Sequence, residues 1–335
     1  MSVRMGIVGV GIMGADHART LVSQVPGATL QALYDADIAR AKTLAAETGT
    51  AAIASDPTAL INDPSVDAII IASPDATHAP LTIACLAAKK PVLCEKPLAP
   101  TTRDALEVVA AETRLGKQLV QIGYMRRFDP SYVELKEKLG SGQLGKALIF
   151  HCVHRNVSAP DWFDSKMAIG NSAVHEFDIA RWVLDTELAS VQVFKPKPAV
   201  ADSSGAPVFL VLESATGQLV NIEVFNNATY GYDVRGEVVC EKGTVSLRGP
   251  LRTETSLAFA QSTTYPADWR PWFADAYRLQ LQAWIKSIQN GTSAGASAWD
   301  GYVAGAVAEA GVASLAANNR VAIQLPDKPA LYNGT

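Results

Sequence analysis

The length, composition and charge of the chain exclude several classes of protein. Its 335 residues suit two domains with sizeable cores better than one small domain. The net charge is -4 and no basic stripe is present, which argues against a nucleic-acid partner. No apolar run reaches the roughly 18 residues of a membrane helix, so we also expect no membrane partner.

The cysteines indicate a reducing environment. Cys85, Cys94, Cys152 and Cys240 lie far apart and form no C-x-x-C pair. This spacing is typical of reduced thiols and not of disulfides or a zinc site. The first predicted strand begins after about four residues, which leaves no room for a signal peptide. We therefore expect a soluble, cytoplasmic protein.

The first third of the chain alternates predicted strands and helices. Near-continuous apolar strands separated by amphipathic helices are typical of a parallel sheet that is covered on both faces. The sequence therefore predicts an α/β protein whose N-terminal domain, residues 1–123, is a dinucleotide-binding Rossmann domain. Its predicted strands are Arg4–Val8, Leu30–Asp35, Ala51–Ala54, Ala68–Ala72, Val92–Glu95 and Leu119–Ile122.

The pattern changes from about Leu144, where long runs alternate apolar and polar residues and contain glycine turns. This alternation predicts an open, mostly antiparallel sheet with one face against helices. We expect residues 124–335 to form this C-terminal α+β domain, which binds substrate and forms the oligomer. Its predicted helices lie in "NSAVHEFDIARWVLD", in "WFADAYRLQLQAWIKSIQNG" and over Ser297–Ala317, and "VADSSGAP" is expected to be a surface loop.

A glycine motif follows the first predicted strand. Gly9, Gly11 and Gly14 have the G-x-G-x-x-G spacing, and Ala15–Val25 can continue as a helix. In this context the first glycine makes a tight turn and the second lets backbone amides approach a pyrophosphate. The third allows the helix to pack closely on the strand. The alternative is an ordinary strand-to-helix turn that uses glycines for backbone reasons only.

Asp35 ends the second predicted strand, 21 residues after Gly14. A dinucleotide fold places a carboxylate here to accept hydrogen bonds from the ribose hydroxyls. Its charge would repel a 2′-phosphate, so NAD is expected in preference to NADP. The alternative is a turn-forming role in "YDAD". Arg40 would weaken the preference if its side chain turned toward the ribose.

Two further motifs follow the fourth and fifth predicted strands, at the edge where open parallel sheets bind ligands. In "SPDATHAPL", His78 is expected to cap or start a helix. In "CEKPLAP", Pro97 biases Lys96 away from helical geometry, so the backbone can aim the lysine; a solvated lysine at a strand end is the commoner case. The predicted cofactor-binding residues are Gly9, Gly11, Ile12, Met13, Gly14, Asp35, Ser73, Pro74, His78, Glu95 and Lys96.

Together these motifs resemble the glucose–fructose oxidoreductase/inositol dehydrogenase (Gfo/Idh/MocA) family. The resemblance lies in "GVGIMG", "SPDATHAPL", "EKPLA" and "GYMRRFDP", and "VHEFDIARW", "TYGYDVRGEVV" and "DAYRLQLQAWI" extend it over nearly the full chain. The later motifs resemble the inositol 2-dehydrogenase branch. The resemblance implies an NAD-dependent dehydrogenase that oxidises a ring hydroxyl of a small polyol or sugar, with myo-inositol or a stereoisomer expected first. It also implies a homotetramer formed through the open sheet.

The resemblance implies roles for five residues. Lys96 contacts the reacting alcohol and stabilises the developing alkoxide, and His175 is the acid/base. Arg126, Tyr232 and Tyr277 line the substrate pocket.

Asn171 stands where the family usually has an aspartate, four residues before His175. Residues four apart share one face of an α-helix, so Asn171 is predicted to lie beside His175 and to hydrogen-bond a substrate hydroxyl. An amide can orient an imidazole but cannot stabilise an imidazolium with a charge. Asp178, three residues after His175, shares the same face and could partly substitute.

No metal site is expected. His151 and His154 in "HCVH" would point to opposite faces of a strand and could not chelate one ion together. Three other functions remain open at this point. They are a different sugar or anhydrosugar dehydrogenase, an NAD-dependent glycoside hydrolase, and an NAD-sensing regulator on the same fold. A regulator would need neither Lys96 nor His175.

Overall fold

The computed structural model describes residues 2–50, 52–197, 207–248 and 253–333. The chain folds into two compact units. The first comprises Met1–Phe128, Asp275–Gly305 and Leu325–Thr335, and the second comprises Asp129–Ala274 and Ala306–Gln324. The sequence prediction had one boundary, between residues 123 and 124. In the structure, two later segments also belong to the first unit. This long-range packing cannot be predicted from local sequence patterns.

The first unit is built on a parallel six-stranded sheet in the order β3-β2-β1-β4-β5-β6. The strands are β1 (Val3–Val8), β2 (Ala28–Tyr34), β3 (Ala52–Ile53), β4 (Ala68–Ile71), β5 (Val92–Cys94) and β6 (Val120–Ile122). The strand order reverses between β1 and β4, which is the point where such sheets bind dinucleotides. The Rossmann prediction is confirmed. Each strand lies within two residues of its expected bounds, and Ala51, the expected start of the third, lies outside the described residues.

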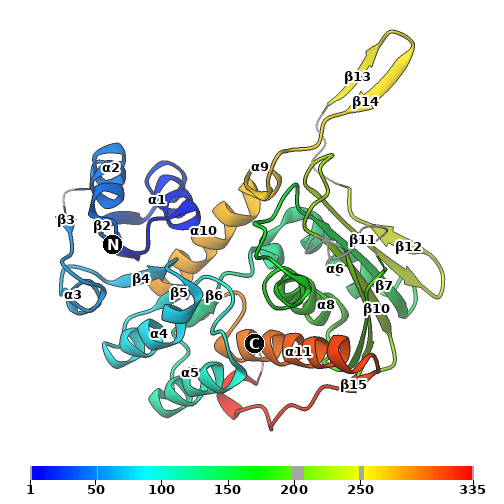
Figure 1. The fold of residues 1–335 in the computed structure, drawn as a ribbon. Coiled ribbons are helices and arrows are strands. Elements are labelled where there is room, and N and C mark those ends of the chain that lie inside the picture. Colours follow the sequence, from blue (N-terminus) through cyan, green and yellow to red (C-terminus); the bar gives the residue numbers. More distant parts are fainter. Residues whose placement is uncertain (1, 51, 198–206, 249–252, 334–335) are drawn as a thin grey trace. The chain divides into compact units, whose positions relative to one another are not determined.

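Helices connect these strands (Figure 1). They are α1 (Ile12–Gln24), α2 (Ile38–Thr48), α3 (Pro57–Asn62), α4 (His78–Ala87) and α5 (Thr102–Leu115), with 3₁₀ turns η1 (Asp75–Thr77) and η2 (Met125–Phe128). Helices α1 and α2 pack together against β2, while α4 lies between α3 and α5. Helix α1 begins at Ile12, three residues earlier than the sequence predicted, so it starts directly after Gly11.

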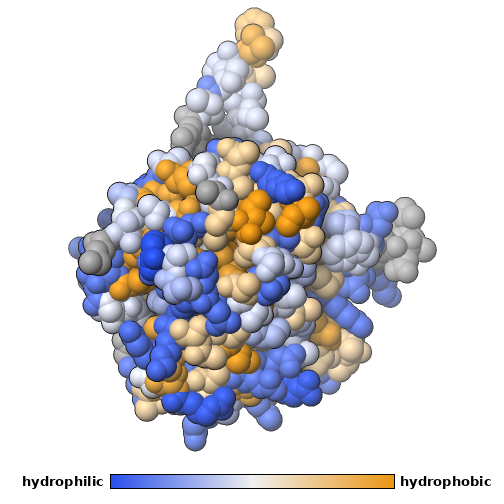
Figure 2. Space-filling model, turned by 90° about the vertical axis from the view of Figure 1, so that its left-hand side faces the viewer, coloured by the Kyte–Doolittle hydropathy of each residue, from blue (hydrophilic) through white to orange (hydrophobic). Residues whose placement is uncertain are grey.

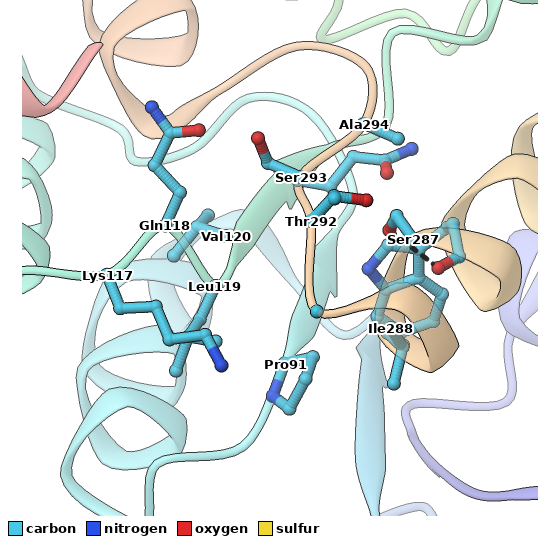
Figure 3. Close-up of a pocket in the computed structure, with 13 residues that line it drawn as sticks. Pro91, Lys117, Gln118, Leu119, Val120, Ser287, Ile288, Thr292, Ser293 and Ala294 are labelled. Carbon is cyan, nitrogen blue, oxygen red and sulfur yellow. Dashed lines mark hydrogen bonds between the residues drawn. The ribbon is translucent and has the colours of Figure 1, made fainter.

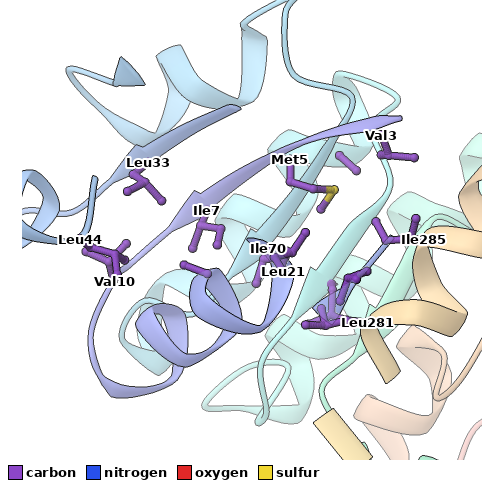
Figure 4. Close-up of a cluster of buried hydrophobic side chains, with 14 of the residues drawn as sticks. Val3, Met5, Ile7, Val10, Leu21, Leu33, Leu44, Ile70, Leu281 and Ile285 are labelled. Atoms are coloured by element: carbon purple, nitrogen blue, oxygen red, sulfur yellow. The ribbon is translucent and has the colours of Figure 1, made fainter. Parts of the chain in front are cut away.

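The core of the first unit explains why a late segment returns to it. Helix α10 (Ala274–Asn290) contributes Leu281, Trp284 and Ile285 to a cluster that also contains Met5 of β1 and Leu21 of α1. Figure 4 shows Leu281 and Ile285 beside the side chains of the first strand and helix. All five side chains are almost fully buried. At roughly 1.5–3 kcal/mol for each buried apolar side chain, this contact is a large stabilising term.

The second unit contains a seven-stranded sheet in the order β12-β11-β7-β10-β9-β8-β15. Its strands are β7 (Ala147–Arg155), β8 (Leu188–Phe194), β9 (Val208–Ser214), β10 (Leu219–Phe225), β11 (Asp233–Cys240), β12 (Thr244–Ser246) and β15 (Val321–Ala322). Only the β7–β10 pair is parallel among the described ladders of this sheet. The prediction of an open, mostly antiparallel sheet is therefore confirmed.

One face of this second sheet is buried. Along β9 and β10 the residues alternate between buried and accessible, as expected when one sheet face packs against helices. The helical elements of the unit include α6 (Pro130–Gly140), α7 (Ser165–Met167), the π-helical turn η3 (Ala168–Ser172), α8 (Val174–Leu184) and α9 (Trp269–Trp272). Helix α11 (Ala298–Ala317) runs from the first unit into the second, where Ser314 Oγ accepts a hydrogen bond from Val193 N at 3.0 Å.

A separate hairpin extends the second unit. Strands β13 (Glu254–Leu257) and β14 (Ala260–Thr263) pair only with each other among the described ladders. Leu257 and Phe259, at the hairpin turn, are strongly exposed, and Figure 2 shows a hydrophobic tip on the projecting segment at the top of the view. The last described element is the 3₁₀ turn η4 (Ala330–Tyr332), in the first unit.

The described helices are all too short or too polar to cross a membrane. Most of the "VADSSGAP" stretch, expected to be a surface loop, lies outside the described residues.

Candidate functional site

The glycine loop has the geometry that its spacing predicts. Gly9 has a φ of +85°, which favours glycine, and a Cβ there would lie 2.6 Å from the Ser73 backbone. A Cβ on Gly14 would lie 1.9 Å from the Gly9 oxygen, whereas one on Gly11 would meet nothing within 4 Å. The first and third glycines are thus required by packing. The space beside the second is open at the start of α1, which suits a phosphate group.

Asp35 directly follows β2 and is tied to the glycine loop. Its Oδ2 accepts a hydrogen bond from Val10 N at 2.7 Å, and its Oδ1 accepts one from Asp37 N at 2.8 Å. Arg40 Nη1 lies 3.6 Å from Asp35 Oδ2. The carboxylate therefore stands at the predicted ribose position, but it also shapes the loop and has the neighbouring arginine that the sequence prediction considered.

The loop after β5 brings Glu95 against His17. His17 Nε2 lies 2.8 Å from Glu95 Oε1, and Lys96 N donates to Glu95 Oε2 at 3.3 Å. Burial by itself would raise the pKa of Glu95, but the hydrogen bond from His17 and the nearby charges of His17 and Lys96 lower it below its usual value. The carboxylate is therefore ionised, and His17 Nε2 must be the donor.

His78 starts α4, as the sequence predicted, and its ring joins two loops. Its Nδ1 lies 2.6 Å from Pro97 O and its Nε2 lies 2.8 Å from Ser73 O. Both partners are carbonyl oxygens, so both nitrogens must carry hydrogens and the ring is an imidazolium. Desolvation opposes this charge, but Cys94 and the two carbonyl groups outweigh it and raise the pKa of His78 to about 10. Both ring nitrogens of His78 therefore bond the two loops, and neither faces solvent.

Two predicted substrate residues lie in the first unit. Arg126, in η2, is almost fully buried. Tyr277, on α10, is also buried, and its ring contacts the edge of the His17 ring at a centroid distance of 5.8 Å. His17 thus touches both Glu95 and Tyr277. Sequence reasoning did not identify His17, although it lies on the helix that the glycine motif opens.

The second unit brings together a different histidine cluster. His175 on α8 and Tyr232 near β11 are buried, and His154 of β7 contacts both of their rings, at centroid distances of 6.2 and 6.1 Å. His154 Nδ1 lies 3.1 Å from Glu176 Oε2. His154 was considered only as a metal ligand in the sequence, and its buried pairing with Glu176 was missed. Its place on the inward-facing side of a strand was the available signal.

The segment before His175 differs from its predicted geometry. Residues 168–172 form a π-helical turn, in which Ala173 N bonds to Ala168 O at 3.0 Å. Asn171 and His175 are therefore not separated by one regular α-helical turn, as the prediction assumed. π-bulges occur mostly as single turns and often at functional sites. Asp178 does lie on α8 with His175, and it is almost fully buried.

A hollow in the first unit lies away from these residues. Figure 3 shows it lined by Pro91, Lys117, Ser287, Thr292 and Ser293, among others. Pro91 and Lys117 precede β5 and β6, so the hollow lies at the amino ends of these strands. Open parallel sheets bind their ligands at the opposite, carboxyl ends, and we assign no cofactor to this hollow.

Metal ligands are not grouped in the part of the chain that the structure describes. No set of three or more His, Cys, Asp or Glu residues there could hold an ion. His151 and His154 lie on opposite faces of β7: His154 is buried, whereas His151 is half-exposed and bonds Asn221 at 2.6 Å. The four cysteines are buried and form no disulfide with one another.

Comparison with known proteins gives full-length matches. Residues 3–124 match a family model described as "Oxidoreductase family, NAD-binding Rossmann fold", and residues 132–246 match the "GFO/IDH/MocA C-terminal domain". The chain is 50% identical to Inositol 2-dehydrogenase 1 of Saccharopolyspora erythraea, covering 99% of both chains. It is 41% identical to Inositol 2-dehydrogenase of Streptomyces avermitilis, covering 98% of this chain and 96% of that one.

A solved structure matches over the same extent. The myo-inositol dehydrogenase from Lactobacillus casei, in complex with NAD(H) and myo-inositol, is 31% identical. Its TM-score is 0.94, and the match covers 99% of this chain and 100% of that one.

Proposed function

This chain belongs to the Gfo/Idh/MocA oxidoreductase family, and we propose that it is an NAD-dependent dehydrogenase that oxidises one ring hydroxyl of a cyclitol to the ketone. The observation that carries the proposal is the 50% identity, over 99% of both chains, to Inositol 2-dehydrogenase 1. The structural match to a myo-inositol dehydrogenase supports it. The resemblance of the motifs around Lys96 and His175 to those of the family supports these two residues as the groups that act on the alcohol. We take myo-inositol or a stereoisomer as the first substrate.

The residues of the first unit fit NAD. The open space at Gly11, the start of α1 and the carboxylate of Asp35 suit a pyrophosphate and a ribose without a 2′-phosphate. We propose that Ile12, Met13, Ser73, Pro74 and the residues of the Glu95–Lys96 turn complete the cofactor site. His78, also predicted to bind the cofactor, supports this edge through Ser73 O and Pro97 O. When NAD is bound, it supplies the acceptor for the hydride that leaves the substrate carbon.

The protein's own groups handle the hydroxyl proton and the charge. In the proposed reaction, His175 takes the proton from the substrate hydroxyl while the C–H bond breaks and the C=O bond forms. The Lys96 ammonium stabilises the negative charge that develops on the substrate oxygen. Arg126, Tyr232, Tyr277 and Asn171 would hold the remaining ring hydroxyls.

One experiment tests the activity directly. Purified protein is mixed with NAD and each of a panel of inositols, aldoses, anhydrosugars and glycosides, and NADH absorbance is recorded. We expect NADH with one or more inositols. Oxidation of aldoses or anhydrosugars alone would assign the chain to another sugar dehydrogenase. Free sugar released from a glycoside without net NADH would assign it to the NAD-dependent hydrolases, and no turnover with NAD binding would favour a regulator.

We also propose a homotetramer formed through the outer face of the second sheet, in the cytoplasm. Phe194 and Phe209 are paired across β8 and β9 and are 45% and 40% exposed on this face. Their burial between subunits would remove apolar area from water. Sedimentation of the native protein and of Phe209→Glu tests this, since the charge should dissociate the tetramer. Cell fractionation tests the location, which the reduced state of the four cysteines favours.

A further inference from the structure

The loop that carries Lys96 is held on both sides by buried histidines from different helices. His17 comes from α1 and His78 begins α4. Neither residue is more than 1% exposed to solvent. Glu95 precedes Lys96 and bonds His17, while Pro97 follows Lys96 and bonds His78. The backbone on each side of the lysine is therefore tied to a separate helix.

The contact before Lys96 is made through an ionised carboxylate. His17 donates to Glu95 Oε1 at 2.8 Å, and Glu95 Oε2 accepts the backbone N–H of Lys96 at 3.3 Å. A Cβ on Gly123 would lie 2.8 Å from that same Oε2, so the carboxylate also packs against the backbone after β6. Glu95 has little room to take another position. Its two hydrogen bonds therefore fix the Lys96 amide relative to α1.

The contact after Lys96 is made by the imidazolium of His78. Its two donors hold Pro97 O at 2.6 Å and Ser73 O at 2.8 Å. The loops after β4 and β5 are thereby fixed to one rigid ring. Only the contact to Pro97 O reaches the segment that carries Lys96. The two ring nitrogens can therefore be tested separately.

We propose that His17 and His78 are positioning residues for Lys96, acting through Glu95 and Pro97. The inference rests on the proposed function, which assigns Lys96 to the reacting oxygen. A misplacement of about 1 Å in a catalytic group can lower turnover about a hundredfold. The two histidines would thus set kcat without touching substrate.

A first experiment measures the loop without using activity. Hydrogen–deuterium exchange of the peptide containing Glu95 to Leu98 is compared in the full-length native protein and in variants. His17→Leu and His78→Leu should speed exchange of the Lys96 amide at least tenfold. Thr82→Val, one turn after His78 on α4, and Leu21→Ala, one turn after His17 on α1, should not. Both control sites are almost fully buried but take no part in the His17–Glu95 and His78–Pro97 contacts.

Conservative variants keep the proposal testable if a leucine variant fails to fold. His17→Gln keeps a donor near the Nε2 position and should restore both exchange protection and kcat. His78→Asn keeps a donor near Nδ1, toward Pro97 O, whereas His78→Gln keeps one near Nε2, toward Ser73 O. The proposal predicts higher kcat for His78→Asn than for His78→Gln.

A second experiment is a double-mutant cycle with Lys96→Met. Each leucine variant should lower kcat about 10- to 100-fold. In the Lys96→Met background the same histidine substitutions should lower kcat no further, because the group they position is gone. A merely structural role would give the same loss in both backgrounds.

Each outcome decides one question. Native exchange of the Lys96 amide in both leucine variants overturns the inference. Faster exchange with unchanged kcat, when Lys96→Met is inactive, also overturns it. Full activity of Lys96→Met refutes the role of Lys96 in the proposed function instead. The exchange data then still show whether His17 and His78 hold the loop.

Discussion

Tyr332 donates a hydrogen bond to the buried carboxylate of Glu112, with 2.7 Å between Oη and Oε2. The other oxygen, Oε1, accepts from Leu119 N at 2.6 Å and from Val120 N at 2.7 Å. One side chain of α5 therefore fixes both the entry to β6 and the C-terminal segment of the first unit.

This arrangement predicts a specific stability pattern at Glu112. Burial raises the pKa of Glu112, although its three hydrogen bonds oppose the shift. A raised pKa stabilises the folded state fully only below the unfolded value, and this contribution is lost as pH rises through the folded value. Native protein should therefore lose stability relative to Glu112→Gln as pH rises above the ordinary pKa of a glutamate.

Denaturant titrations at several pH values measure this difference. Glu112→Ala should cost about 2–4 kcal/mol at low pH, because it leaves buried N–H groups without an acceptor. This cost should shrink as pH rises, because the native protein then loses stability. Tyr332→Phe should cost less, since it removes one donor only. Equal stability of the Ala and Gln variants would contradict this account.

His78 predicts a loss of stability of the same sign at higher pH. Its pKa is raised to about 10, so its contribution to folding is complete below about pH 6.5 and is lost as pH rises through about 10. The difference in unfolding free energy between native protein and His78→Asn should shrink over this window, by at most about 5 kcal/mol. Urea titrations from pH 6 to pH 10 measure it, with Thr82→Val as control. A difference that stays constant with pH would show that the ring is neutral.

Asp35 should decide the choice between NAD and NADP. Asp35→Asn keeps an acceptor for the Val10 N–H and removes only the charge, so it separates cofactor choice from loop shape. We expect the NAD preference in kcat/KM to fall about 10- to 100-fold, equivalent to about 1–3 kcal/mol. Arg40→Ala should raise the preference, since Arg40 is the cation nearest to Asp35 among the described ion pairs. A native enzyme that prefers NADP would refute this assignment.

Lys96→Ala and His175→Ala should each lower kcat about a hundredfold or more, the usual loss for a positioned proton-transfer group. The dissociation constant of NAD should change far less, because its pyrophosphate and ribose contacts lie elsewhere. Steady-state kinetics and fluorescence titration measure the two quantities. Lys117→Ala, at the amino edge of the first sheet, is the control. Near-native turnover would remove the substituted residue from the mechanism.

Local patterns were sufficient to predict most of the fold, including the strands of the first sheet. The apolar strands, the turn at Gly9 with its φ of +85°, and the start of α4 at His78 depend on residues close together in sequence. The His17–Glu95 pair joins positions 78 residues apart, and α10 returns to the first core after the whole second sheet. Neither contact can be predicted from the residues next to it in sequence, because His17 and α10 could each have packed against another part of the chain.

The segment around Asn171 shows a second kind of limit. Spacing predicted that Asn171 and His175 share a helical face, which assumes 3.6 residues per turn. The turn over residues 168–172 is π-helical instead. A four-residue spacing alone cannot report whether a turn is α-helical or π-helical.

Asn171 therefore gives the last and most discriminating prediction. The proposed reaction needs a deprotonated His175, and a nearby carboxylate favours the protonated imidazole more than an amide does. The acidic limb of kcat/KM against pH should therefore move to higher pH in Asn171→Asp. The shift should be about one unit for side chains in contact and smaller across a water molecule or a widened turn. KM for the polyol should also change if Asn171 bonds a substrate hydroxyl.

Asp178→Asn is the matched comparison, because it removes a carboxylate from the helix of His175 instead of adding one. Its acidic limb should move to lower pH, opposite to that of Asn171→Asp. Both profiles are recorded with saturating NAD, and the dissociation constant of NAD serves as the control for folding of the first unit. A limb that stays in place in Asn171→Asp, or moves to lower pH, would show that position 171 is not coupled to the base.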